Sequence, residues 1–354
     1  MTNNVFILGA GASAAAGVPM MDKFLDRARD LAESNQTDVD KDAFDLIFSA
    51  LDILPQTHSK ATLDIDNVES VFSALEMARI VGLFGDFPAE QIPKLDDAMR
   101  RVIATTIENS MVIRSSGKQA IPPEPYYEFA SLVHRLVTSH PRHSATIVTF
   151  NYDLAVDYAL HFVGLPVSYG FAEDDPADGL PLLKLHGSLN WAECTHCQDV
   201  VPWRLHKYFQ NYGWHDLDLV KKVRLSVSRH LRQFSYHDWV TASAPVVVPP
   251  TWGKASQHLR LAKVWNGAAR ALQTAENIFI VGYSLPPSDA FFKYLYALGT
   301  IGKTRIRRFW VFNPDSKVDS RYRELLGQSV QSRYQFQAVK FDEAIKVIEA
   351  EFPA

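Results

Sequence analysis

A short apolar strand that runs straight into a glycine-rich turn places the strongest constraint on how this chain can fold. Residues 4–8 are an asparagine and four apolar residues, and residues 9–15 read Gly-Ala-Gly-Ala-Ser-Ala-Ala. Such a run ending in glycine is typical of a buried parallel strand. The turn behind such a strand can present backbone amides to phosphates. The sequence therefore predicts a nucleotide-binding unit, with a bend required only by backbone geometry as the alternative.

The spacing within this turn indicates a dinucleotide. Gly9, Gly11 and Ala14 fit the pattern G-x-G-x-x-G/A, in which the second glycine lets a pyrophosphate approach. A hydride-transfer domain also has a second strand that ends in Asp or Glu about 20 residues further on. We expect one helix over residues 13–31, and residues 26–45 are polar, with no apolar strand. The pattern therefore argues against a dehydrogenase.

Strand and helix patterns alternate over the last third of the chain. The strand-like runs are 277–284, 305–315 and 334–339, and the helix-like runs are 268–275, 289–299 and 320–327. Alternation of this kind predicts an α/β fold, here a Rossmann-like parallel sheet with helices on both faces.

The middle of the chain predicts a helical insertion into that fold. Residues 67–84 and 94–113 have apolar spacings of three and four, and we find no convincing strand between 36 and 139. We therefore expect a catalytic α/β domain, a helical subdomain and a small irregular module inside the catalytic domain. Their ranges are 1–35 with 140–354, 36–139, and 192–245, respectively.

Small or polar residues follow four of the predicted strands at the point where each strand ends. They are Asn151 and Asp153, His186, Gly282 and Ser284, and Asn313 and Asp315. Because open α/β sheets bind ligands outside the carboxyl ends of their strands, we expect these residues to line one crevice.

Two of these residues have structural alternatives that the sequence leaves open. Asp153 begins a helical run and is as well suited to cap that helix as to orient a polar substrate. Histidine suits general base catalysis near neutral pH, but a histidine by itself, such as His186, is more often structural.

Composition excludes several classes of protein. The formal net charge is −4, so there is no overall basic field for nucleic acid. The chain has two cysteines, which suits a reducing cytoplasm rather than a disulfide framework. No window offers the roughly 18 apolar residues of a membrane span. We expect a cytoplasmic protein that contacts neither membrane nor nucleic acid.

Taken together, these residues resemble the sirtuin family. Its pattern reads Gly-Ala-Gly-x-Ser, Gly-Ile-Pro, Asn-x-Asp, His-Gly, Gly-x-Ser and a late Asn. The residues that match it here are Gly9, Ala10, Gly11 and Ser13, Gly17 to Pro19, Asn151 and Asp153, His186 and Gly187, Gly282 and Ser284, and Asn313.

The resemblance implies that NAD is a substrate, cut at its nicotinamide–ribose bond. By resemblance, Asn151 positions a water or the ribose hydroxyls, Asp153 holds the carboxamide, and His186 is the base. By the same resemblance, the pyrophosphate is bound by Gly9, Ala10, Gly11 and Ser13. The adenosine half is contacted by Ser284 and Asn313.

The chain also departs from the sirtuin deacylases. Those enzymes carry two Cys-x-x-Cys pairs that hold zinc, whereas this chain has only Cys194 and Cys197. We therefore expect no metal site, although the pair with His196, His206 or His215 is a conceivable zinc set. Met20 and the residues after it stand where the family has Asp-Phe-Arg.

The large helical insertion after the first predicted helix, which contains residues 67–76, resembles a divergent bacterial branch of the family that acts in antiviral defence as NAD hydrolases. The resemblance implies a homo-oligomer or a partner such as a HerA-type ATPase or an Argonaute. The alternatives are an NAD-dependent protein deacylase and a non-catalytic module that binds NAD or ADP-ribose.

Overall fold

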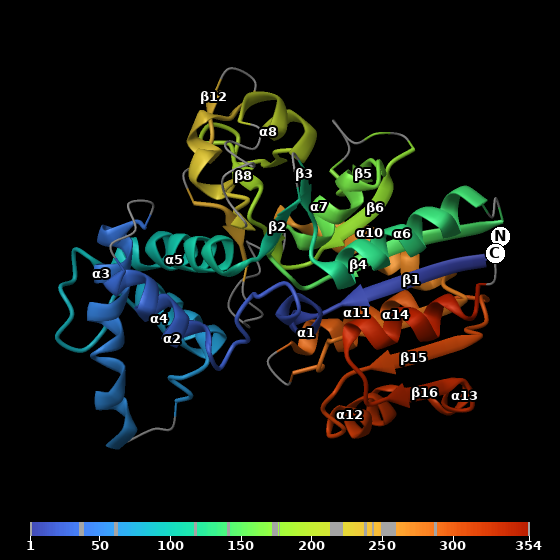
Figure 1. The fold of residues 1–354 in the computed structure, drawn as a ribbon. Coiled ribbons are helices and arrows are strands. Elements are labelled where there is room, and N and C mark those ends of the chain that lie inside the picture. The colour runs from blue at the N-terminus through green and yellow to red at the C-terminus, as the bar shows by residue number, and fades with distance from the viewer. Residues whose placement is uncertain are drawn as a thin grey trace.

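A seven-stranded parallel sheet forms the centre of the fold (Figure 1), in the order β16-β15-β14-β1-β4-β6-β5. Its strands are β1 (Thr2–Leu8), β4 (His143–Thr149), β5 (Val167–Ser168), β6 (Leu180–Lys184), β14 (Asn277–Val281), β15 (Arg308–Phe312) and β16 (Tyr334–Gln337). The computed structural model describes residues 2–34, 39–59, 63–116, 119–139, 142–171, 176, 178–212, 222–236, 239–242, 244–248, 260–286 and 289–352.

Strand β1 lies in the middle of this sheet, between β14 and β4. Its last residue, Leu8, pairs with Val281 on one side and Thr149 on the other. Because these strands are parallel and in register, the loops that follow them leave the sheet at one edge. Residues 5–8 are buried, as the apolar run predicts for a central strand.

Two groups of helices cover the sheet. Helix α6 (Glu124–Ser139) packs on β4, with α7 (Ala155–Phe162) and α14 (Phe341–Glu349) beside it. Helix α10 (Ala262–Thr274) packs on β1 and β6, with α11 (Ala290–Gly299) beside it. Helices α12 (Val318–Leu325) and α13 (Gln328–Gln331) join β15 to β16. The predicted Rossmann-like α/β fold with a parallel sheet is confirmed.

Four helices form a separate layer, which we call the helical layer (blue to teal in Figure 1). They are α2 (Phe24–Glu33), α3 (Lys41–Leu51), α4 (Val68–Val81) and α5 (Leu95–Ser110), with 3-10 turns at Leu54–Ser59 and Ile92–Lys94. Helix α5 packs against the other three. The side chain of Asn67 caps α4 by accepting from the amides of Glu69 and Ser70.

The first helix is shorter than the sequence predicts. The single helix expected over 13–31 is wrong: α1 covers Ala10–Ala14, and α2 begins only at Phe24. Gly17 has φ +87°, and a side chain there would lie 2.8 Å from the carbonyl oxygen of Ser110. Pro19 follows, so residues 15–23 leave the helical path and cross to the helical layer.

The expectation of no strands between 36 and 139 is also wrong. Strands β2 (Ile113–Ser116) and β3 (Gln119–Ile121) pair as a hairpin, and β10 (Lys222–Val223) adds to it. The remaining elements of residues 187–247 are short: β7 (Gly187–Ser188), β8 (Trp191–Glu193), β9 (Val200–Pro202), α8 (Leu205–Asn211), a 3-10 turn (Ser228–Gln233), β11 (Ser235–Tyr236), β12 (Trp239–Val240) and β13 (Val246–Val247).

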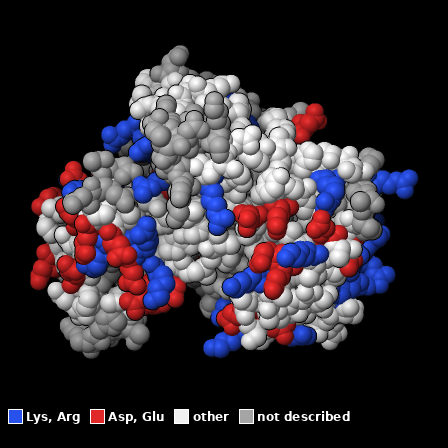
Figure 2. Space-filling model, in the orientation of Figure 1, with Lys and Arg blue, Asp and Glu red and all other residues white. Residues whose placement is uncertain are grey.

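Charged side chains of both signs are interspersed on the face drawn in Figure 2. Acidic and basic groups lie side by side over the helical layer, so this face carries no broad patch of one sign. Within the described ranges, every helix is too short or too polar to span a membrane.

A buried carboxyl group joins the helical layer to the segment before β11. Glu108 on α5 accepts hydrogen bonds from the amide of Ser228 at 2.8 Å and from its hydroxyl at 2.7 Å. Burial raises the pKa of Glu108 to about 7, against the opposing hydrogen bonds from Ser228. The carboxyl is therefore charged in the unfolded chain but largely protonated in the folded protein between pH 4.5 and 7.

Glu108→Gln is expected to flatten the dependence of stability on pH. In the parent protein, unfolding releases a proton from Glu108 over this range, so its contribution to stability falls by about 3 kcal/mol as the pH rises through it. The unfolding free energy of the variant relative to the parent should rise by about this amount between pH 4.5 and 7.5, measured by urea unfolding. Glu128→Gln, at an exposed position on α6, should show no such gain; an equal gain there would contradict the assignment.

Candidate functional site

A cavity of about 470 Å³ opens at the carboxyl edge of the sheet, where β1, β4, β6, β14 and β15 end. Eleven of the twelve residues predicted from the sequence line it. They are Ala10, Gly11, Ser13, Pro19, Asn151, Asp153, His186, Gly282, Ser284, Asn313 and Asp315. The twelfth, Gly9, lies beneath the cavity against Tyr283. The predicted crevice is therefore one continuous space.

The glycine-rich turn packs directly on the loop after β14. The amide of Gly9 donates to the carbonyl oxygen of Val281 at 3.0 Å, and that of Gly11 donates to Gly282 at 2.9 Å. A Cβ at Gly9 would lie 2.4 Å from Cα of Tyr283, and one at Gly11 would lie 2.9 Å from Cα of Gly282. Glycine is thus required at both positions because the backbone of this turn lies against the backbone of the loop after β14. The amides of Gly9 and Gly11 both donate hydrogen bonds to that loop.

Gly282→Ala is expected to destabilise the protein by about 3 kcal/mol or more. Gly282 has φ +65°, and an added Cβ would lie 2.4 Å from the amide nitrogen of Ala12. Gly82 is a matched control, because its φ is +67° but nothing lies within 4 Å of the Cβ position. Gly82→Ala should cost only the backbone strain, about 1 kcal/mol. Equal losses in urea unfolding would show that crowding at Gly282 is unimportant.

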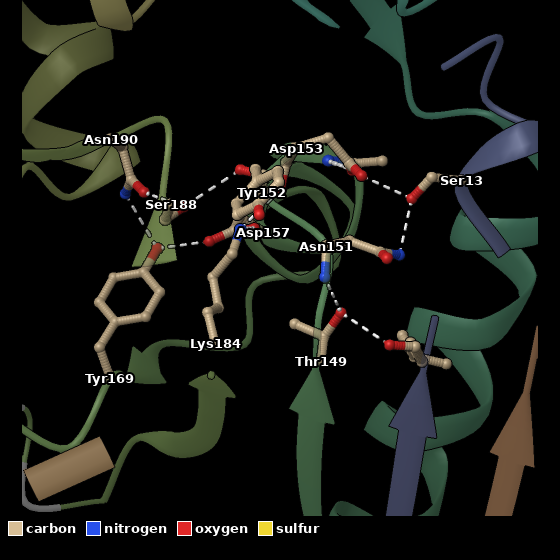
Figure 3. A network of polar contacts seen from close by, with 12 residues as sticks. Ser13, Thr149, Asn151, Tyr152, Asp153, Asp157, Tyr169, Lys184, Ser188 and Asn190 are labelled. Atoms are coloured by element: carbon tan, nitrogen blue, oxygen red, sulfur yellow. Dashed lines mark hydrogen bonds and ion pairs between the residues drawn. The ribbon is translucent and has the colours of Figure 1, made fainter. Parts of the chain in front are cut away.

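Asn151 links the end of β4 to the glycine-rich turn. Its side-chain nitrogen donates to Oγ of Ser13 (Figure 3) and to the carbonyl oxygen of Gly9, both at 2.8 Å. Its backbone amide donates to Oγ1 of Thr149 at 3.1 Å. The side chain is therefore held in one orientation, and its oxygen is the atom left to contact a ligand.

Both carboxylate oxygens of Asp153 accept hydrogen bonds from the protein itself. Oδ1 accepts from the amide of Ala155 at 2.9 Å, and Oδ2 accepts from Oγ of Ser13 at 2.5 Å. Ser13 is also 2.9 Å from the hydroxyl of Tyr126 on α6. Burial raises the pKa of Asp153, while the charge of Lys184 and the Ser13 hydrogen bond oppose the rise. Asp153 lies one residue before Leu154, the N-cap of α7, so it does not occupy the N-cap position that the sequence left open, although its Oδ1 accepts from the first helical amide.

A buried ion pair that the sequence analysis missed lies behind these residues. Nζ of Lys184, the last residue of β6, donates to Oδ2 of Asp157 at 2.8 Å and to the carbonyl oxygen of Asp153 at 2.6 Å. Tyr169 donates to the other oxygen of Asp157 at 2.6 Å, and Asn190 donates to Tyr169 (Figure 3). The network ties the loop after β4 to the segment after β6. A lysine inside the apolar run 180–185 was the available signal.

His186 reaches the cavity from the turn after β6. It is 4% exposed, and its ring packs against Phe150, with the centroids 5.1 Å apart. Gly187 follows with φ +89°, where a Cβ would lie 2.0 Å from the carbonyl oxygen of Val246. Nε2 of His186 lies 3.7 Å from Oδ2 of Asp289, a second residue that the sequence analysis did not single out.

The loops after β14 and β15 form the opposite rim. The carbonyl oxygen of Ser284 accepts from Arg321 at 2.9 Å. Oδ1 of Asn313 accepts from the amide of Asp315 at 3.0 Å, and Asp315 in turn accepts from the amide of Lys317. The side chains of Asn313 and Asp315 thus stabilise their own turn, and both residues line the cavity together with Ser284.

The remaining wall is apolar and comes mainly from the helical layer, which the sequence analysis did not connect to the site. Its lining side chains are Val18, Phe24, Val68, Phe72, Ile103 and Ile107. Apolar spacing identified the inner faces of these helices, but it does not say what a face covers. The sheet thus supplies most of the polar residues of the cavity, and the helical layer supplies an apolar wall together with Asn67 and Glu69 at the start of α4.

The cysteine pair lies away from this cavity, in the turn between β8 and β9. Cys194 is buried and Cys197 is exposed. Hydrogen bonds from the backbone amides of Cys197 and His196 lower the pKa of the Cys194 thiol. The described part of the chain holds no group of three or more metal-ligating side chains. His215 lies outside the described residues.

Comparison with known proteins gives distant likenesses. No family model matches the chain, and no curated protein matches it. A mutant Sir2 homologue in complex with ADP-ribose is similar over 98% of this chain and 90% of its own, at 15% identity and a TM-score of 0.41. A Sir2 homologue in complex with NAD is similar over 99% and 90%, at 16% identity and a TM-score of 0.38. At such low scores, the fold assignment rests on the strand order of this chain itself.

Proposed function

We propose that this protein hydrolyses NAD, cutting the bond between nicotinamide and ribose to give nicotinamide and ADP-ribose. The observation that carries the proposal is the single cavity in which Asn151, Asp153 and His186 face the glycine-rich turn. Their order and their places at strand ends resemble the sirtuin pattern. Among the described residues, the elements that follow the glycine-rich turn are helices, and no strand with an acidic end comes next. This order favours NAD as a substrate over NAD as a redox cofactor.

The chemistry asks for orientation, electrostatic help and an activated water. The electron pair of the glycosidic bond leaves with nicotinamide, positive charge develops on the ribose, and water adds to the ribose carbon. His186 would accept the proton that this water loses. Asn151, fixed by Gly9 and Ser13, would orient the water or a ribose hydroxyl through its oxygen. The apolar wall would limit access of other water to the reacting carbon.

Purified protein incubated with NAD tests the proposal. We expect the parent protein to release nicotinamide and ADP-ribose in equal amounts, as measured by chromatography. The Asn151→Ala variant should release neither product. An acetyl-lysine peptide is added in a second arm. Formation of O-acetyl-ADP-ribose there would identify a deacylase, and binding of NAD without nicotinamide release would identify a non-catalytic module.

A role in defence against phage is the biological part of the proposal and is supported by the resemblance to the antiviral branch. Infected cells that express the protein are expected to lose NAD and to release fewer phage. Cells that express Asn151→Ala should do neither. Equal phage yields from both strains would contradict the defence role but not the enzymatic one.

A further inference from the structure

Asp289 is a buried carboxylate on the wall of the cavity. It is 2% exposed and immediately precedes α11. Its Oδ2 accepts a hydrogen bond from the hydroxyl of Tyr283 at 2.6 Å and lies 3.7 Å from Nε2 of His186. Its Oδ1 is buried and has no hydrogen-bond partner among the described residues.

A buried carboxylate oxygen without a donor is costly, because it has lost water and gained nothing in return. Such an atom in a cavity indicates a ligand that brings the missing donor. Tyr283, whose hydroxyl contacts Oδ2, belongs to an aromatic cluster with Phe150 and Phe292, in which Phe150 and Tyr283 stack at 4.0 Å.

A second buried carboxylate of the cavity, Asp153, differs in this respect. Both of its oxygens already accept hydrogen bonds, from Ser13 and from the amide of Ala155. Of these two buried carboxylates, Asp289 is therefore the one with an oxygen that accepts no hydrogen bond from the described residues.

We infer that Oδ1 of Asp289 accepts a hydrogen bond from a hydroxyl of the ribose that carries nicotinamide. This rests on the proposed function. We assign the donor to the ribose because Asp289 neighbours His186, which would act at the ribose carbon. The two hydroxyls of that sugar are the donors of NAD nearest to this carbon. A carboxylate there also stabilises the positive charge that develops on the sugar as nicotinamide leaves.

The test measures equilibrium binding and cleavage of three ligands by the parent protein and by Asp289→Asn. The ligands are NAD and its two analogues that lack either the 2′- or the 3′-hydroxyl of the nicotinamide ribose. Since hydrogen bonds to a charged group are strong, Asp289→Asn should weaken NAD binding or kcat/KM by about 10- to 100-fold. With the analogue that lacks the contacted hydroxyl, parent and variant should differ by less than about threefold.

Asp342→Asn, at an exposed position in the first turn of α14, is the matched control and should leave all values unchanged. The melting temperature without ligand should not fall in Asp289→Asn, because asparagine keeps an acceptor for the Tyr283 hydroxyl and replaces an oxygen that has no donor among the described residues. Equal losses with all three ligands, or no loss with NAD, would overturn the inference. If the parent binds NAD without cleaving it, the proposed hydrolysis fails, and the binding constants alone decide the role of Asp289.

Discussion

His186→Asn is expected to lower kcat/KM for NAD cleavage by about 100- to 10,000-fold, the range of a lost general base. Asparagine keeps a polar side chain of similar width but cannot accept a proton near neutral pH. The ring of His186 packs against Phe150, with the centroids 5.1 Å apart, so a small loss of packing accompanies the change. Nicotinamide release under subsaturating NAD is the measurement.

The control for this prediction is His206→Asn, an exposed position on α8 outside the cavity, which should cleave NAD like the parent. The melting temperature of His186→Asn should stay within a few degrees of the parent value. Retention of more than a tenth of the activity by a folded His186→Asn protein would remove His186 from the mechanism.

Lys184→Met is expected to destabilise the protein by about 3–5 kcal/mol, because it leaves the carboxylate of Asp157 buried without its cation. Methionine has nearly the same shape as the lysine stem, so the loss reports charge rather than volume. Lys184 and Asp157 are essentially inaccessible, and Nζ also holds the carbonyl oxygen of Asp153. Urea unfolding measures the change.

The double variant Lys184→Met with Asp157→Asn provides the comparison. It removes both charges, and the new side-chain amide can still accept a hydrogen bond from the hydroxyl of Tyr169, so most of the lost stability should return. Losses that simply add in the double variant would contradict an ion pair. Recovery of stability without recovery of NAD cleavage would show that the lysine also positions the loop that carries Asn151 and Asp153.

The predictable part of this molecule is the part whose signal is local. Strands that end in glycine or polar residues, followed by helical spacing, were enough to predict the parallel sheet and the crevice at its edge. The break after α1 was missed, although Gly17 and Pro19 were visible signals, because the alanine-rich run 14–16 continues the helical pattern.

The rest depends on contacts between distant segments. Lys184 at the end of β6 pairs with Asp157 on α7, and the sequence shows only a charge inside an apolar run. Asp289 follows the loop that contains the predicted site residues Gly282 and Ser284. Only its burial in the folded protein distinguishes it from other acidic residues, and the sequence does not show that burial. The apolar wall needs the position of the helical layer, which amphipathic spacing does not provide.

The central position of β1 has a consequence for how the protein is made. Asn4 on β1 accepts from Asn277 on β14 at 2.9 Å, although the two are 273 residues apart in the chain. Contacts this distant in sequence form late and slowly. A ribosome must therefore have passed β14 and the loop behind it before the first strand gains its second neighbour and the glycine turn gains its support. A fragment that ends before β14 lacks the loop that supports the glycine turn, so we expect such fragments not to cleave NAD.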